Sequence, residues 1–122
     1  MQERRRAPRL RIKVPVSLRM PNREVARLGE TVDLSRNGAY FGSEYFMGEG
    51  TRLPVTLELP ADEAHPACTI HPDGIVVRCQ PEAEDPSVRE YEVAVFFMDL
   101  DEDDQSLLDG FLERRLGKAT AR

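Results

Sequence analysis

The stretch YEVAVFFMDLDEDDQSLLDGFLERRL (residues 91–116) decides the fold class, because the spacing of its apolar residues changes midway. Its first part alternates with a period of two, through Tyr91, Val93, Val95 and Phe97, which predicts a half-buried strand. Its second part has helical spacing, at Leu107, Leu108, Phe111, Leu112 and Leu116. Acidic residues open this second part and basic residues end it, as the helix dipole favours. The stretch predicts a last strand followed by a C-terminal helix at about 101–117.

The same two-residue alternation recurs upstream. It predicts strands in RIKVPVSLR (11–19), VARLGETVDL (25–34), AYFGS (39–43) and TRLPVTLELP (51–60), with a bulge or bend at Gly29 and a tight turn at SRNG (35–38). The stretch CTIHPDGIVVRC (68–79) is either one long strand broken near Pro72 or a small hairpin, and its periodicity does not decide between them. About six strands and one helix predict a mainly β fold, a small six-stranded antiparallel β-barrel with a C-terminal α-helix packed on or plugging it.

Charge is distributed unevenly along the 122 residues. Residues 1–23 hold eight Arg or Lys against Glu3 alone, whereas the other 99 residues hold nine basic and 21 acidic side chains. We expect a flexible, basic, arginine-rich N-terminal arm at 1–10, a barrel with its helix at 11–117, and a tail at 118–122. The negative body disfavours a broad contact with nucleic acid and favours a small anionic ligand held at the arm.

Other features of the composition limit the setting of the protein. No apolar run approaches the roughly 18 residues of a membrane span, and the leading arginines run into an alternating pattern, which is unlike a secretory signal. Two cysteines, Cys68 and Cys79, are too few for a disulfide scaffold in a chain of this length. We expect a cytoplasmic protein without a membrane span.

The segment DLSRNG (33–38) holds a carboxylate, a hydroxyl and a glycine where a predicted strand runs into a turn. Residues two apart on a strand share a face, so Asp33 and Ser35 are expected to point the same way. A carboxylate there can accept two hydrogen bonds from the adjacent N–H donors of a guanine edge, and the hydroxyl can bind a phosphate or a base. Gly38 can let the backbone turn and approach a ligand closely.

Two motifs together resemble the PilZ domain family. RRAPR (5–9) is similar to its RxxxR element, and DLSRNG to its (D/N)xSxxG element, in the same order and about 24 residues apart. The segments GIVVRC (74–79) and YEVAVFF (91–97) and the C-terminal helix are similar to the later elements of the family. The resemblance covers nearly the whole chain.

This resemblance implies a receptor for the bacterial second messenger cyclic di-GMP. Arg5 and Arg9 would grip phosphate and the Hoogsteen edge of guanine, while Asp33 and Ser35 would read other guanine edges, beside Gly38. Arg4, directly before the motif, resembles family members that take up an intercalated dimer of the ligand. The resemblance further implies an adaptor, without cofactor or catalytic activity, whose arm orders on the ligand and engages an unidentified downstream protein.

Other functions are weighed against this one. A PilZ-type protein-interaction module that does not bind nucleotide is the main alternative, followed by a nucleic-acid-binding barrel that uses the basic arm. His65, Cys68, His71 and Cys79 lack the spacing of a zinc site, and the acidic run after Asp99 lacks the glycine and glutamate of a calcium loop. No nucleophile–base pair can be nominated, so we expect neither a metal site nor an enzyme.

Overall fold

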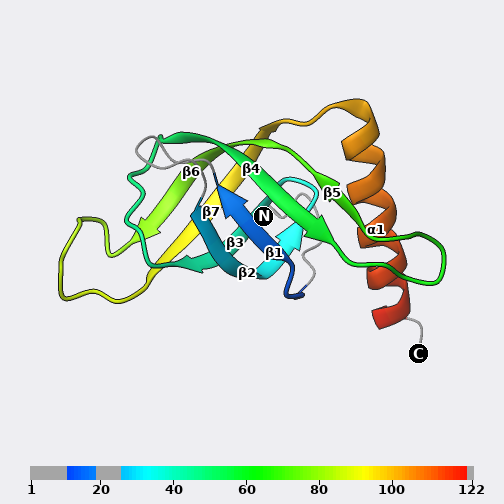
Figure 1. Cartoon of the computed structure of the whole chain (residues 1–122), viewed down its shortest axis with the longest axis horizontal. Helices are drawn as coiled ribbons and strands as arrows, with labels where there is room; N and C mark the ends of the chain where they lie inside the picture. Colours follow the sequence, from blue (N-terminus) through cyan, green and yellow to red (C-terminus); the bar gives the residue numbers. More distant parts are fainter. Residues whose placement is uncertain (1–10, 19–25, 121–122) are drawn as a thin grey trace, which may run out of the picture.

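The computed structural model describes residues 11–18 and 26–120, with the backbone alone described at 18, 26–32 and 117–120. Within these residues the chain forms seven strands and one helix (Figure 1). The arm predicted at 1–10, with Arg4, Arg5 and Arg9, lies outside the described residues.

All strand pairs are antiparallel, and the sheet closes on itself. The elements are β1 (Pro15–Leu18), β2 (Ala26–Ser35), β3 (Gly38–Ser43), β4 (Arg52–Leu59), β5 (Cys68–Ile70), β6 (Asp73–Gln80), β7 (Tyr91–Asp99) and α1 (Glu102–Thr120). The strand order is β1-β2-β3-β7-β6-β4-β5, and β1 also pairs with β4. The predicted antiparallel barrel with a C-terminal helix is confirmed. The helix continues to Thr120, three residues past its expected end.

The doubtful stretch at 68–79 is one interrupted strand and not a hairpin. Both β5 and β6 pair with β4, and the register runs on unchanged from Leu59↔Cys68 to Arg52↔Ile75. Between them the N–H of Val55 donates to the carbonyl of Pro72 at 2.9 Å. Proline has no N–H to give to the ladder, which explains a break at this point in an otherwise continuous strand. Seven strands are therefore the six predicted ones with one of them divided.

Irregular pairing on β2 bends the barrel. Val16 pairs with Gly29 and Ser17 with Arg27, so Leu28 is an extra residue beside the glycine where a bulge is predicted. A second irregularity follows, because Thr31 pairs with Phe41 and Asp33 with Tyr40, which leaves Val32 as an extra residue. Bulges of this kind increase local twist and re-aim the residues after them.

The alternating residues fill one core. Every second residue of β7, from Tyr91 to Phe97, is buried, and so are the matching positions of β3 and β4. Leu108, Phe111 and Leu112 of α1 belong to the same cluster. Burying such a side chain is worth about 1.5–3 kcal/mol each, so the pattern read from the sequence is also what stabilises the barrel.

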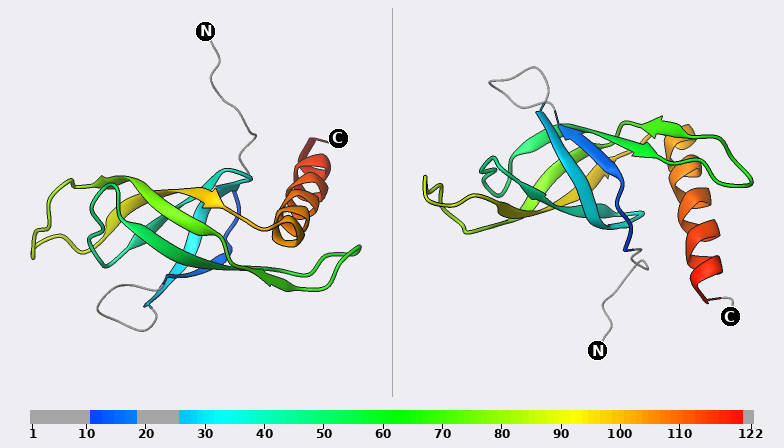
Figure 2. Two further views of the ribbon diagram at one scale, coloured as in Figure 1. Left: turned by 90° about the horizontal axis from the view of Figure 1, so that it is seen from above. Right: turned by 60° about the horizontal axis from the view of Figure 1, so that its bottom comes forward.

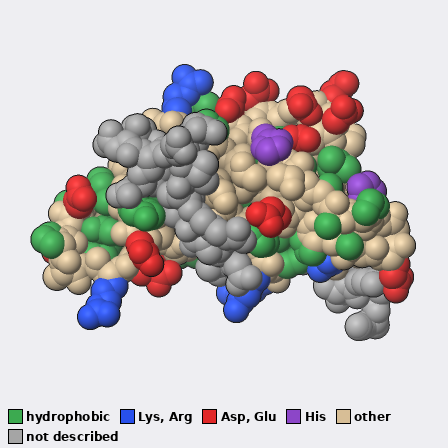
Figure 3. Space-filling view, viewed as in Figure 1, with side chains coloured by type: hydrophobic (Ala, Val, Ile, Leu, Met, Phe, Trp, Pro, Cys, Tyr) green, Lys and Arg blue, Asp and Glu red, His purple; other side chains and the backbone are tan. Residues whose placement is uncertain are grey.

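The helix packs on the barrel and does not plug it. In Figures 1 and 2, α1 stands beside β5 at one end of the barrel. Its start is capped by Asp101, whose Oδ1 accepts from the N–H of Asp104 at 2.9 Å. Figure 3 shows acidic side chains gathered at the edge where α1 begins, which suits the positive end of the helix dipole.

Candidate functional site

The β2–β3 hairpin brings Asp33, Ser35 and Gly38 together. Strand β2 ends at Ser35, β3 begins at Gly38, and Arg36 and Asn37 form the two-residue turn between them. The hydroxyl of Ser35 accepts from the N–H of Asn37 at 3.1 Å, which fixes the turn and leaves its own O–H free to donate. Asp33 and Ser35 lie on the same face, as expected.

Gly38 is required by the neighbouring strand. A Cβ at this position would collide with the carbonyl oxygen of Val95 on β7, while the N–H of Phe97 donates to the carbonyl of Asn37 at 2.7 Å. Its φ is outside the left-handed region, which among the described glycines only Gly50 occupies. From the sequence, Gly38 is expected to let the backbone turn and come close to a ligand. In the structure, the missing side chain of Gly38 lets β3 lie close to β7.

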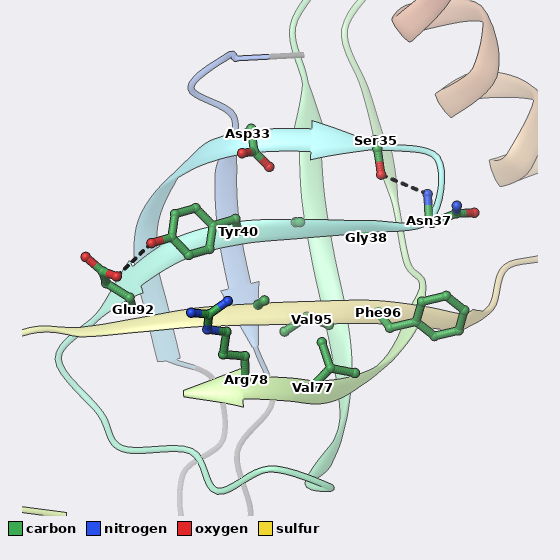
Figure 4. Close-up of a pocket in the computed structure, with 12 residues that line it drawn as sticks. Asp33, Ser35, Asn37, Gly38, Tyr40, Val77, Arg78, Glu92, Val95 and Phe96 are labelled. Atoms are coloured by element: carbon green, nitrogen blue, oxygen red, sulfur yellow. Dashed lines mark hydrogen bonds between the residues drawn. The ribbon is translucent and has the colours of Figure 1, made fainter. Parts of the chain in front are cut away.

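These residues line an open groove of about 380 Å³ on the outer face of the barrel (Figure 4). The groove crosses four strands, β2, β3, β7 and β6, so its two sides come from distant parts of the sequence. Asp33 and Ser35 form one side, and Val77 and Arg78 of β6 form the other.

One end of the groove is polar. The hydroxyl of Tyr40 donates to Oε1 of Glu92 at 2.8 Å, and this hydrogen bond is the main reason that the pKa of Tyr40 is raised. Tyr40 therefore stays protonated at neutral pH and holds Glu92 in place. Asp33 and Arg78 flank this pair in Figure 4, so the polar end holds two carboxylates and one guanidinium.

The other end of the groove exposes two apolar side chains beside the polar Ser35 and Asn37 (Figure 4). Val77 is 52% exposed and Phe96 is 46% exposed, although both lie on strands in the middle of the sheet. Phe96 pairs with Gly38, which has no side chain to cover the ring. Exposed apolar surface gathered in a concave site is typical of ligand-binding sites.

The turn itself is tied to the helix. Nε and Nη2 of Arg36 donate to the two carboxylate oxygens of Asp109 at 3.0 and 3.1 Å. The hydrogen bond from Arg36 is the main reason that the pKa of Asp109 lies below its usual range. Ser35 and Asn37 face the groove while Arg36 reaches α1, so one turn contacts both regions.

The structure brings three of the expected site residues, Asp33, Ser35 and Gly38, together in one groove, and Arg4, Arg5 and Arg9 lie outside the described residues. Sequence reasoning missed the side of the groove formed by β6 and β7. One signal was present for Phe96, because two adjacent aromatic residues in an alternating strand cannot both face the core. Among the described residues no cluster of three metal-ligating side chains occurs, and none of their helices is long and apolar enough to span a membrane.

Comparison with known proteins agrees with this fold. The family model for the PilZ domain matches residues 3–114. The inhibitor of motility MotI/DgrA of Bacillus subtilis has a TM-score of 0.74 and 22% identity, over 96% of this chain and 54% of that one. The PilZ domain of YcgR from Escherichia coli, solved with c-di-GMP, has a TM-score of 0.64 and 17% identity, over 98% and 99%.

A third structure, the MrkH–c-di-GMP complex from K. pneumonia, has a TM-score of 0.67 and 22% identity, over 99% of this chain and 57% of that one. The chain thus spans little more than half the length of MotI and MrkH. At these identities the likeness to solved structures shows the fold. No curated protein matches the chain.

Proposed function

The chain belongs to the PilZ domain family, and on that premise we propose that it is a cyclic di-GMP receptor that signals to a partner protein in the bacterial cytoplasm and carries out no catalytic step. The observation that carries the proposal is the groove. Asp33 and Ser35 face it from β2, and apolar surface at Phe96 and Val77 lies at its other end. A guanine base has a flat apolar face and a polar edge, and both find a counterpart there.

In this proposal Asp33 reads the base. Its carboxylate accepts from the adjacent N–H donors of the guanine Watson–Crick edge, and the O–H of Ser35 donates to a phosphate or base acceptor. For this role the side chain of Asp33 has only to accept hydrogen bonds. Adenine lacks the paired donors, so the site distinguishes cyclic di-GMP from cyclic di-AMP.

The phosphates need more positive charge than the described groove offers. Its lining carries the carboxylates of Asp33 and Glu92 against the single guanidinium of Arg78. An anionic ligand therefore needs cations from elsewhere, and the arm holds four arginines within six residues. We assign phosphate binding to Arg5 and Arg9, whose planar guanidinium groups donate in pairs and stack on bases, and a second ligand molecule to Arg4.

Ordering of the arm is the proposed signal. Residues 1–9 offer no apolar side chain larger than alanine or proline after Met1, and five of them are charged, so little offsets the roughly 1–2 kcal/mol per residue needed to fix a backbone. A ligand with two phosphates supplies the counter-charge. Amide exchange at residues 2–9 should slow when cyclic di-GMP is added, and equal exchange in both states would refute the ordering step.

Titration calorimetry with cyclic di-GMP tests the binding role of Asp33. Asp33→Ala should weaken binding by tenfold or more, because charged hydrogen bonds are worth about 1.5–3 kcal/mol and about 1.4 kcal/mol is tenfold. Asp73→Ala removes an exposed carboxylate outside the groove and should bind as the unmodified chain does. Equal affinity for cyclic di-AMP would remove the guanine-reading role.

Arg5→Ala and Arg9→Ala test the arm in the same titration. Each should lose at least tenfold in affinity, and lysine should restore little, because it cannot donate in a pair to the Hoogsteen edge of guanine or stack on the base. If neither the unmodified chain nor any variant binds cyclic di-GMP, the protein is instead the interaction module that does not bind nucleotide. The exposed Phe96 and Val77 would then be the surface that a protein partner contacts.

A further inference from the structure

Arg78 is a basic side chain on the side of the groove opposite Asp33, where sequence reasoning assigned no residue. In Figure 4 its side chain runs from β6 across β7 toward Tyr40. Among the described residues it makes no hydrogen bond and no ion pair, and the hydroxyl of Tyr40 donates to Glu92. It is the one basic side chain in the described lining of the groove.

A β-bulge aims this side chain. Val76 pairs with Val95 and Arg78 pairs with Ala94, so Val77 is an extra residue on β6 with no partner on β7. Two consecutive residues, Val77 and Arg78, consequently lie exposed on the groove side of the strand. Bulges beside functional sites commonly re-aim a side chain in this way.

Strict alternation would have buried the arginine. Val76 faces the core, so in a regular strand Val77 would face outward and Arg78 inward. The extra residue reverses the second half of β6, and Cys79 takes the buried position instead. Ala94 opposite Arg78 is small and lets the long side chain lie over β7. An arginine at a formally inward position is the signal in the sequence for this bulge.

We propose that Arg78 is a ligand-binding residue of the groove, and that its guanidinium binds a phosphate of the nucleotide whose base Asp33 reads. This inference rests on the proposed function and deepens it. The two carboxylates at this end would repel an anionic ligand unless a cation faces the groove beside them. An unpaired guanidinium aimed into the groove supplies that cation without breaking an existing ion pair.

Titration of Arg78→Ala with cyclic di-GMP tests the inference. Affinity should fall about tenfold, the size expected for loss of one charge-assisted hydrogen bond to phosphate. Arg78→Lys should recover part of this loss, because a phosphate accepts from a point charge. Arg52→Ala is the matched control, since Arg52 is exposed on β4 and lies outside the groove. All three variants should keep the thermal stability of the unmodified chain.

The outcomes separate the inference from the function on which it rests. If the unmodified chain binds cyclic di-GMP and Arg78→Ala binds equally well, the inference is overturned and the receptor stands. If Arg52→Ala loses as much affinity as Arg78→Ala, only the overall charge matters and Arg78 is no ligand contact. If Arg78→Lys is as weak as Arg78→Ala, assignment to phosphate is wrong. If the unmodified chain binds no cyclic di-GMP, the proposed function itself fails.

Discussion

Apolar side chains are buried at the helix end of the barrel and exposed on its groove side. At the helix end Phe111 is 1% exposed and Leu108 is fully buried, whereas on the groove side Phe96 is 46% exposed and Val77 is 52% exposed. Both regions are built on the same closed sheet. One end is covered by α1, and no described element covers the outer face of β6 and β7. The covered end stabilises the fold, and the open face is available to bind.

The two regions also differ in whether their polar side chains have partners. At the helix end, Nε of Arg114 donates to Asp62 at 2.7 Å, and Asp104 accepts from the backbone N–H of His71 at 2.8 Å. In the groove, Arg78 has no ion pair with a described residue, and Ser35 has a donor to spare. Satisfied polar groups hold an end together, while unsatisfied ones on an exposed face can be satisfied by a ligand.

Two phenylalanines allow the sharpest comparison of these regions. Phe111→Ala should lower the free energy of unfolding by about 3–5 kcal/mol, because a buried ring is replaced by a cavity. Phe96→Ala should cost about 1 kcal/mol or less, since its ring is half exposed, yet it should weaken cyclic di-GMP binding, because base–aromatic stacking is worth about 1–3 kcal/mol. Denaturant unfolding and calorimetry check both. Equal destabilisation by the two variants would contradict the distinction between a helix end that stabilises the fold and a groove side that binds ligand.

Gly38 lines the groove, but substituting it is expected to lower the stability of the fold. Gly38→Ala should destabilise the chain by about 1–3 kcal/mol, because the added Cβ collides with the backbone of Val95 and forces β3 and β7 apart. Gly48→Ala is the control, because its Cβ would meet only ordinary contacts with Phe46 and Thr51. An unfolding curve for Gly38→Ala that overlays the control would show that the two strands have room to separate.

The smallest effect is expected at the contact between the two regions. Arg36→Ala breaks the exposed pair with Asp109 and should cost about 0–1 kcal/mol. The pair lowers the folded-state pKa of Asp109, so its contribution is present above the ordinary carboxyl pKa and is lost as the pH falls. Unfolding curves of both chains should therefore converge on acidification. A difference that grows at low pH would contradict the ion pair.

Much of the fold could be predicted because alternation and helical spacing report burial directly. The last strand and α1 were expected within a few residues, since buried Tyr91 to Phe97 and Leu108 to Leu112 carry those two periods. The division between β5 and β6 could not be predicted, because a proline breaks a strand and begins a turn equally well. Only pairing with β4 distinguishes the two.

Half of the candidate site could be predicted as well. Asp33, Ser35 and Gly38 are close in sequence, so a single hairpin brings them together. Arg78 and Phe96 reach the groove only through long-range pairing and the bulge at Val77, and alternation assigns Arg78 to the wrong face. A one-residue shift reverses every side chain after it, and local patterns do not record where such shifts fall.

The most direct test of the central claim is the position of amide chemical-shift changes as cyclic di-GMP is titrated into the labelled chain. The account predicts that shifts gather at Ser35, Gly38, Arg78 and Phe96, in the groove, and that the amides of α1 beyond Asp109 stay unchanged. Shifts centred on α1 with the groove unaffected, or no shifts with saturating ligand, would contradict it.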